Sequence, residues 1–294
     1  MERSGRFCRI AIAAPALAER AAPGQIVTLL PAALAGIAPG FSPEGRPILL
    51  KRPFGIHRIL GPEGRPWRPG QPRAAFEILA EIKGPTSRTL AALGPGDDVE
   101  VLGPVGRPLP PPPPGGTAVL VAGGIGAAPL LFAGSEFARA GIRTVLLLGV
   151  RDEPPVALGK GPARRLGSLV LDCDAPDFEA EGVRSFVADE KGGDGRFSGL
   201  VTGLLEAFLD ADRPANPHVF ACGPWPMMRA VAGVCASRGI PDWHLLEEVM
   251  GCGIGICVSC VVPVKGPNGA TGQRKVCVDG PAFRGADVEW GGKP

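Results

Sequence analysis

Four cysteines close to the C-terminal end of the chain have a spacing that suits metal and sulfur chemistry. Cys252, Cys257 and Cys260 form the pattern C-x4-C-x2-C, and Cys277 follows at a distance. Plant-type ferredoxins hold a [2Fe-2S] cluster with cysteines at this spacing. A structural zinc site usually has two C-x2-C pairs, whereas this segment has one. The spacing therefore favours an iron–sulfur cluster and leaves a zinc site or unligated cysteines as alternatives.

Glycines alternate with other residues around the first of these cysteines, at positions 251, 253 and 255. A glycine lacks the side chain that would keep the backbone away from cluster sulfides, and it tolerates a positive φ. Backbone N–H groups in such a loop would donate hydrogen bonds to the cluster sulfurs and so set the reduction potential of the cluster. The remaining cysteines are scattered, unlike a secreted disulfide framework, at Cys8, Cys173, Cys222 and Cys235.

Two glycine-containing turns are candidates for a dinucleotide site. Gly123-Gly124-Ile125-Gly126 follows an apolar run and precedes a predicted helix, so it would present a helix N-terminus to a pyrophosphate. A plain tight turn is the alternative. Cys222-Gly223-Pro224 ends another apolar run and would line the crevice for a nicotinamide. Cys222 would serve equally well as a small buried hydrophobe.

The N-terminal part of the chain offers two possible anion sites. Arg52 next to Pro53, at the expected end of a strand, would be a rigid corner that aims a guanidinium at a phosphate. Residues 83–90 would supply backbone N–H groups at a helix start. The alternative for this second segment is a capped surface helix with Thr86 or Ser87 as N-cap.

The elements that carry these residues change character along the chain. Residues 1–108 contain short β-like runs at 26–30, 47–50, 75–82 and 99–102, which predict a small antiparallel β-barrel or sandwich. A proline run at 110–114 with two glycines after it predicts a linker. This organisation places the first domain at 1–108.

A parallel sheet is predicted from residue 115 to residue 241. A strand at 118–122, a helix at 128–140 and a strand at 144–150 form one unit, and a helix at 198–209, a strand at 218–222 and a helix at 226–238 continue it. Strand and helix in alternation indicate a doubly wound α/β domain. The cysteine segment, 242–294, would be a third, small unit.

Composition narrows the functional classes. Of the 294 residues, 45% are hydrophobic. The 31 basic and 29 acidic residues give a net charge of +2, so the chain lacks the excess of positive charge that nucleic-acid-binding proteins carry. The uncharged stretch at 117–135 contains glycines and a proline and reads as strand, turn and helix rather than a membrane span. We expect a soluble, cytoplasmic protein. The three histidines, His57, His218 and His244, are isolated, so we assign no catalytic acid or base.

The order of barrel, dinucleotide domain and cysteine segment resembles the electron-transfer subunits of class 1B dihydroorotate dehydrogenase, a family of the ferredoxin reductase superfamily. Residues 248–262 and 274–283 are similar to the cluster loop and closing segment of that family. The resemblance implies that each of the four cysteines ligates a [2Fe-2S] cluster, namely Cys252, Cys257, Cys260 and Cys277.

The resemblance also implies FAD on the barrel and NAD on the α/β domain. The implied flavin residues are Arg52, Pro53, Phe54 and Gly55, then Leu79, Ala80 and Glu81, then Thr86 and Ser87. The implied NAD residues are Gly123, Gly124 and Gly126, with Cys222, Gly223 and Pro224. Gly55 stands where the family usually has Ser or Thr, and Thr86 where it has Gly. Because the chain has no tyrosine, Phe54 is the expected aromatic neighbour of the flavin.

Hydride transfer moves two electrons and a [2Fe-2S] cluster accepts one, so a flavin between NAD and the cluster is required. The family reading predicts a partner FMN subunit that oxidises dihydroorotate to orotate in pyrimidine biosynthesis, in a heterotetramer of two subunits of each kind. The alternatives are a related NAD(P)H flavin and iron–sulfur oxidoreductase subunit with another partner, or a zinc-ribbon scaffold. Arg151, just past the strand at 144–150, is a surface arginine or a 2′-phosphate contact, and the family points to NAD.

Overall fold

The computed structural model describes residues 2–31, 50–193, 195–266 and 268–291. Its contacts group the chain into two compact units. The first unit contains Met1–Pro108, Glu247–Val262 and Gln273–Pro281, and the second contains Leu109–Leu246, Pro263–Gly272 and Ala282–Pro294. The residues from 242 onward are thus shared between the two units. The division of the chain into 1–108, 115–241 and 242–294 according to cofactor stays a prediction.

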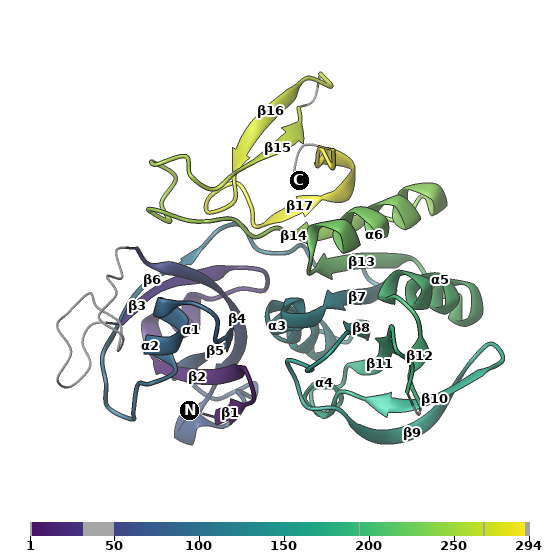
Figure 1. Ribbon diagram of the computed structural model, residues 1–294, viewed down its shortest axis with the longest axis horizontal. Coiled ribbons are helices and arrows are strands. Elements are labelled where there is room, and N and C mark those ends of the chain that lie inside the picture. Colours follow the sequence, from purple (N-terminus) through teal and green to yellow (C-terminus); the bar gives the residue numbers. More distant parts are fainter. Residues whose placement is uncertain (1, 32–49, 194, 267, 292–294) are drawn as a thin grey trace. The chain divides into compact units, whose positions relative to one another are not determined.

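The first unit is built on a six-stranded antiparallel sheet in the order β1-β2-β5-β4-β3-β6 (Figure 1). Its strands are β1 (Glu2–Ser4), β2 (Phe7–Ala13), β3 (Ile26–Pro31), β4 (Arg52–Leu60), β5 (Ala75–Glu81) and β6 (Val99–Val105). Its helices are α1 (Pro15–Arg20), the short 3-10 turn η1 (Pro62–Gly64) and α2 (Pro85–Leu90). The antiparallel β class predicted for this part of the chain is confirmed.

Burial of large aliphatic and aromatic side chains holds this sheet together. Leu29, Ile56, Phe76 and Ile78 come from three neighbouring strands and are almost completely buried. Burying such side chains contributes roughly 1.5–3 kcal/mol each. The predicted runs at 26–30, 75–82 and 99–102 are strands, whereas residues 47–49 lie outside the described residues. Strand β2 was not anticipated from the sequence.

The second unit contains a seven-stranded sheet in the order β12-β11-β8-β7-β13-β14-β17, parallel except for β17 (Figure 1). Its strands are β7 (Thr117–Gly123), β8 (Arg143–Val150), β11 (Arg184–Asp189), β12 (Phe197–Ser198), β13 (Pro217–Cys222), β14 (Asp242–Leu245) and β17 (Ala282–Arg284). One small antiparallel pair accompanies it, β9 (Gly159–Leu166) with β10 (Leu169–Asp174). A further pair, β15 (Val261–Lys265) with β16 (Thr271–Lys275), contains residues of both units. The doubly wound class is confirmed.

The helices of the second unit connect and cover the parallel strands. They are η2 (Gly124–Gly126), α3 (Ala127–Arg139), α4 (Pro176–Glu179), α5 (Val201–Asp212), α6 (Trp225–Arg238) and η3 (Gly285–Asp287). Helix α3 contacts α4, and α5 contacts α6, so the helices form two layers around the sheet. Every residue of β7 is buried. This is why β7 reads in the sequence as a continuous apolar run instead of an alternating one.

The position of β13 decides where a ligand would bind in this sheet. The chain runs from β7 to its neighbour β8 and onward to β11, and then returns to place β13 on the other side of β7. Open α/β sheets bind ligands at the carboxyl ends of the strands, where the strand order reverses in this way. The carboxyl ends of β7 and β13 are therefore the expected ligand position.

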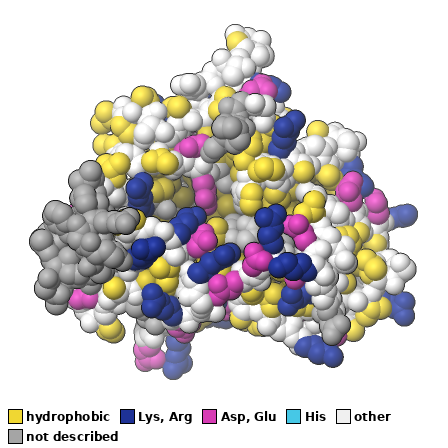
Figure 2. Space-filling model, viewed as in Figure 1, with side chains coloured by type: hydrophobic (Ala, Val, Ile, Leu, Met, Phe, Trp, Pro, Cys, Tyr) yellow, Lys and Arg dark blue, Asp and Glu magenta, His cyan; other side chains and the backbone are white. Residues whose placement is uncertain are grey.

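On the face drawn in Figure 2, basic and acidic side chains are interspersed rather than gathered by sign. This agrees with the net charge of +2. In the part of the chain that the structure describes, no helix combines the length and the apolar character needed to cross a membrane.

Candidate functional site

The inner half of the cysteine site is a buried pair in the first unit. The Sγ atoms of Cys260 and Cys277 lie 3.3 Å apart, and both residues are buried. The N–H group of Val276 donates to the carbonyl oxygen of Cys260 at 2.8 Å, which fixes the two segments side by side. Tertiary packing thus brings together two cysteines that are distant in the sequence.

The outer half is formed by Cys252 and Cys257, whose side chains lie close enough to interact. Cys252 is partly buried and Cys257 is exposed. The Sγ atom of Cys252 accepts hydrogen bonds from the N–H groups of Ile254 and Cys257, each at 3.4 Å. The hydroxyl group of Ser259 lies 3.2 Å from the Sγ atom of Cys257. Backbone N–H groups and a hydroxyl therefore surround sulfur in a loop of only a few residues.

The two halves differ in their electrostatics. The Ser259 hydroxyl, followed by the Ser259 backbone, lowers the pKa of Cys257 to about 6. The backbone N–H groups of Cys257 and Ile254 lower the pKa of Cys252. Burial, followed by the neighbouring Cys260 thiol, raises the pKa of Cys277 to about 11. Iron binds thiolates, so the outer sulfurs are favoured in the ligating form, whereas Cys277 must release its proton when the metal binds.

Glycine geometry in the loop fits a close approach of backbone to a bound group. Gly253 and Gly255 have φ values of +72° and +85°, a region that L side chains rarely adopt. A Cβ on Gly251 would stand 3.2 Å from the Sγ atom of Cys257, and one on Gly255 would stand 3.1 Å from Val278. Val258 also has a positive φ, 50°. Strain at a β-branched residue in this loop was not foreseen from the sequence.

The four sulfurs are arranged as two pairs. Among the described residues, no three His, Cys, Asp or Glu side chains gather as ligands of one ion. The cysteines lie instead as two pairs, Cys252 with Cys257 and Cys260 with Cys277. A structural zinc ion needs four ligands around one point, whereas a [2Fe-2S] cluster takes two thiolates on each iron. The two cysteine pairs therefore suit the two irons of a [2Fe-2S] cluster.

The cluster loop packs on the antiparallel sheet of the same unit. A Cβ on Gly253 would stand 3.3 Å from Thr28 of β3 and from Leu102 of β6. Next to this contact lies a pocket of about 580 Å³. The Lys51 Nζ atom and Glu100 form an ion pair of 2.7 Å in its lining. The lining residues are Leu30, Leu50, Lys51, Glu100, Val101, Leu102, Gly251 and Cys252. The cluster loop and the strands thus share one site in the first unit.

Seven of the residues expected to bind flavin lie on the strands β4 and β5. Arg52, Pro53, Phe54 and Gly55 pair with Leu29, Thr28, Val27 and Ile26 of β3. The prediction that this stretch ends a strand is wrong, because β4 begins at Arg52. Pro53 is tolerated because it is only the second residue of the strand. Leu79, Ala80 and Glu81 close β5, and Glu81 forms ion pairs with Arg6 at 3.5 Å and with Lys83 at 3.0 Å.

Thr86 and Ser87 lie inside α2 and not at its N-cap. The N-cap is Gly84, and the Ser87 Oγ atom accepts hydrogen bonds from the N–H groups of Lys83 and Gly84, each at 3.0 Å. The alternative in which Thr86 or Ser87 is the N-cap is therefore wrong. A serine at the third helical position caps the helix start from within. The flavin contacts of all these residues stay predictions.

The two turns expected to bind NAD meet in the second unit. An added Cβ on Gly126 would overlap the carbonyl group of Cys222, and one on Gly223 would stand 3.0 Å from the Cα atom of Gly123. Pro224 is also within reach of Gly123, since a Cβ there would stand 2.8 Å from its ring. The η2 turn leads directly into α3, which is the position for a pyrophosphate. Glycine at 123, 126 and 223 is thus required for packing of the turns as well as for access.

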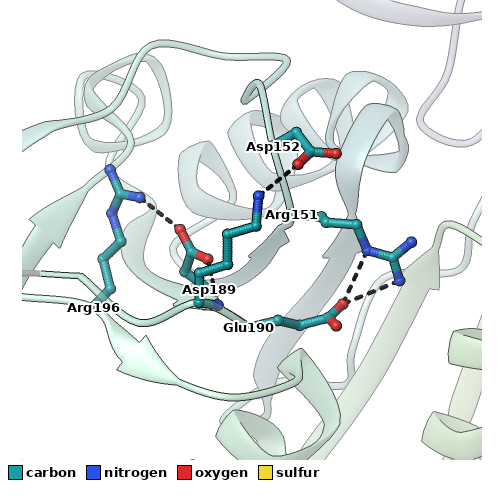
Figure 3. Close-up of polar contacts among 6 residues, drawn as sticks. Arg151, Asp152, Asp189, Glu190 and Arg196 are labelled. Carbon is teal, nitrogen blue, oxygen red and sulfur yellow. Dashed lines mark hydrogen bonds and ion pairs between the residues drawn. The ribbon is translucent and has the colours of Figure 1, made fainter.

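A group of charged side chains lies at the carboxyl ends of β8 and β11 and was largely missed in the sequence (Figure 3). Arg151 donates to Glu190, and Lys191 donates to Asp152. Arg196 donates to Asp189 at 2.8 Å. These two loops lie together only because the ends of the parallel strands β8 and β11 are adjacent. The ion pairs between them could therefore not be predicted from a local sequence pattern.

Residues 247–289 match the family model described as the iron–sulfur cluster binding domain of dihydroorotate dehydrogenase B. The electron transfer subunit of dihydroorotate dehydrogenase B (NAD(+)) from Desulforamulus reducens is 32% identical over 277 residues, covering 94% of this chain and 90% of that protein. The subunit of the same name from Bacillus caldolyticus is 35% identical over 243 residues, covering 82% and 80%.

A solved structure has a similar fold. It comes from work on flavin-based electron bifurcation and is an NADH-dependent reduced ferredoxin-NADP oxidoreductase. The TM-score is 0.71 at 24% identity, and the match covers 99% of this chain and 88% of that one. At this identity the likeness concerns the fold alone. It agrees with the ferredoxin reductase type of architecture expected from the sequence.

Proposed function

This chain belongs to the family of electron transfer subunits of dihydroorotate dehydrogenase B (NAD(+)), and from that membership we propose that it passes electrons from a catalytic partner subunit through a [2Fe-2S] cluster and FAD to NAD+. The partner would oxidise dihydroorotate to orotate at FMN, as a step of pyrimidine biosynthesis. Two subunits of each kind would form the complex, in the cytoplasm.

The observation that carries this proposal is the pairing of the four cysteines. A buried sulfur pair and a more exposed one are formed by the loop that packs against β3 and β6 and by the segment around Cys277. Cys260 and Cys277 would hold the inner iron, and Cys252 and Cys257 the outer iron. When bound, FAD converts between the two-electron chemistry of NAD and the one-electron chemistry of the cluster.

The chain's own residues would set the two ends of this transfer. At the cluster, the N–H groups of Ile254 and Cys257 and the hydroxyl of Ser259 stabilise negative charge on sulfur. At the nucleotide end, the η2 turn would direct backbone N–H groups toward the pyrophosphate, and the Cys222 turn would flank the nicotinamide. No group of this chain is assigned to proton transfer from dihydroorotate.

The partner would dock on an exposed apolar surface around the outer cysteines, which we call the cluster collar. Its members are large hydrophobic residues with 39% to 76% of their surface exposed, Val249, Ile254, Ile256, Val258 and Val278. Ile256, immediately before Cys257, is the most exposed of them, at 76%. Exposed apolar groups gathered around one site mark an interaction surface. Docking there would bring the electron donor next to the exposed Cys257.

Cofactor analysis tests the first part of the proposal. The purified chain should contain about two irons and about one FAD, and should reduce artificial acceptors with NADH while leaving dihydroorotate unchanged when alone. Zinc in place of iron, without flavin, would contradict electron transfer and support a scaffold protein. Dihydroorotate oxidation by the isolated chain would contradict the division of labour between subunits.

Co-expression with an FMN-binding dihydroorotate dehydrogenase subunit tests the partner. We expect a complex that reduces NAD+ with dihydroorotate, and Ile256→Asp should weaken its assembly without loss of iron or FAD. Val170→Asp is the matched control, because Val170 is an exposed hydrophobic residue (54%) of the second unit. If both variants assemble as well as the wild type, the cluster collar is not the docking surface.

A further inference from the structure

We propose that Glu190 makes one edge of the parallel sheet selective for NAD over NADP, by holding Arg151 in an ion pair and presenting a carboxylate to the ribose. This edge, formed by the carboxyl ends of β13, β7, β8 and β11 and the turns and loops that follow them, is called the nucleotide edge below. This inference rests on the proposed function, since it needs a dinucleotide at the carboxyl edge of the parallel sheet. It assigns a specificity role to a residue in a loop that the sequence alone does not connect with Arg151.

The strand order locates the adenosine end of the dinucleotide. The turn after β7 is the candidate pyrophosphate site, and β13, with the Cys222 turn at its end, lies on one side of β7. Strands β8 and β11 lie on the other side and run parallel to β7. If the nicotinamide occupies the β13 side of the crevice, the adenosine ribose extends over the ends of β8 and β11.

The loops that begin at these two strand ends are cross-linked by ion pairs (Figure 3). Strand β8 ends at Val150, and Arg151 donates through Nε and Nη2 to the Oε1 atom of Glu190, just past β11, at 3.3 Å and 3.2 Å. The Nζ atom of Lys191 donates to the Oδ1 atom of Asp152 at 2.9 Å. Each loop therefore contributes one cation and one carboxylate.

A third ion pair completes a group with balanced charge. Arg196 donates to the Oδ2 atom of Asp189 at 2.8 Å, and the Oδ1 atom of Asp189 accepts the N–H group of Lys191 at 2.9 Å. Three cationic and three acidic side chains thus neutralise one another at this edge. A phosphate ester that arrived here would meet carboxylates as well as cations, and every cation would already have an acidic partner.

This balance favours a hydroxyl group over a phosphate at the ribose 2′ position. A hydroxyl group can donate a hydrogen bond to a carboxylate, whereas a 2′-phosphate is repelled by it. In dinucleotide-binding sheets, an acidic side chain that hydrogen-bonds the ribose 2′-hydroxyl selects NAD, and a nearby arginine accommodates the 2′-phosphate of NADP. The side chains of Arg151 and Glu190 are 73% and 41% exposed, so a nucleotide can reach both. Glu190 therefore decides whether the Arg151–Glu190 pair offers a carboxylate to a 2′-hydroxyl group or a free guanidinium to a 2′-phosphate.

Removing the carboxylate charge tests the proposal by equilibrium binding. Glu190→Gln should leave Arg151 free to bind a 2′-phosphate. Calorimetric titration of the cofactor-loaded protein with 5′-AMP and with adenosine 2′,5′-bisphosphate measures the effect without turnover. We expect the wild type to prefer AMP, and E190Q to bind the bisphosphate about tenfold more tightly. Adding Arg151→Gln to E190Q should reverse that gain.

Asp210→Asn is the matched control, because Asp210 and Arg238 also form an exposed carboxylate–arginine pair in the second unit. They lie near the C-terminal ends of α5 and α6, which is the opposite edge of the sheet. Unchanged bisphosphate affinity in E190Q, or a gain that survives the loss of Arg151, would overturn the proposal. A wild type that binds neither nucleotide would contradict the nucleotide site itself, which separates the two failures.

Discussion

The cluster loop and the nucleotide edge build their sites in different ways. At the cluster site, the chemistry depends on the identity of a few side chains, since cysteine sulfurs from two short segments supply all the candidate ligands. At the nucleotide edge, the site depends on the backbone and on the strand order, because two glycine turns and two charged loops become neighbours only through the sheet. The comparison teaches that the first site depends on a few side chains and the second on close backbone packing.

Loss of one inner cysteine should have the largest effect. Cys277→Ser removes a buried sulfur that lies 3.3 Å from the Cys260 sulfur, and iron content and cluster absorption should be lost almost completely. Iron analysis and visible circular dichroism measure this. Cys173→Ser changes a buried cysteine of β10 in the second unit and should keep the cluster. Equal iron contents in the two variants would show that Cys277 is no ligand.

A single methyl group at the nucleotide edge should have the next largest effect. Gly126→Ala would push a Cβ into the carbonyl group of Cys222, so the two turns must separate at a cost of roughly 1–3 kcal/mol. NAD+ affinity should fall at least about tenfold, with iron and flavin retained. Gly233→Ala, on α6 where nothing lies within 4 Å of the new Cβ, is the control. Normal NAD+ affinity in the Gly126 variant would place the nucleotide elsewhere.

Removal of the hydroxyl group of Ser259 should tune the cluster without destroying it. This hydroxyl lies 3.2 Å from the Cys257 sulfur and accepts the N–H group of Gly251 at 2.9 Å. Ser259→Ala should keep the iron and shift the reduction potential to a more negative value, because a hydrogen bond that stabilises the reduced cluster is lost. A redox titration measures it. Ser237→Ala, with an exposed hydroxyl on α6, should leave the potential unchanged.

The cysteines of the second unit should respond least. Burial, followed by the charge of Asp242, raises the pKa of Cys235 to about 12. Iodoacetamide at pH 8 should therefore leave Cys235 unmodified in the folded protein, as peptide mass analysis would reveal. In the unfolded chain this thiol has its ordinary pKa of 9.0, so the group makes the fold less stable as the pH rises from about 9 toward 12. Rapid labelling at pH 8 would show that the thiol is accessible.

Sequence reasoning succeeded where the pattern is local. The boundaries of β7, α3 and α6 agree with prediction to within a residue or two, because continuous apolar runs and glycine turns are signals within a few positions. The prediction that residues 50–55 end a strand at a rigid corner is wrong, because pairing with β3 makes Arg52, Pro53 and Gly55 the beginning of β4. Cross-strand pairing is a tertiary contact that overrides local propensity.

By itself, the sequence favoured iron–sulfur chemistry and determined the α/β class, because cysteine spacing and apolar periodicity are properties of residues close together in the chain. It also determined the family, through motifs that run along most of the chain. Only the tertiary structure decided that the cysteines form an inner and an outer pair of opposite burial, and that Arg151 meets Glu190. Burial and contacts between distant loops depend on how strands are ordered in space, and no local pattern specifies that order.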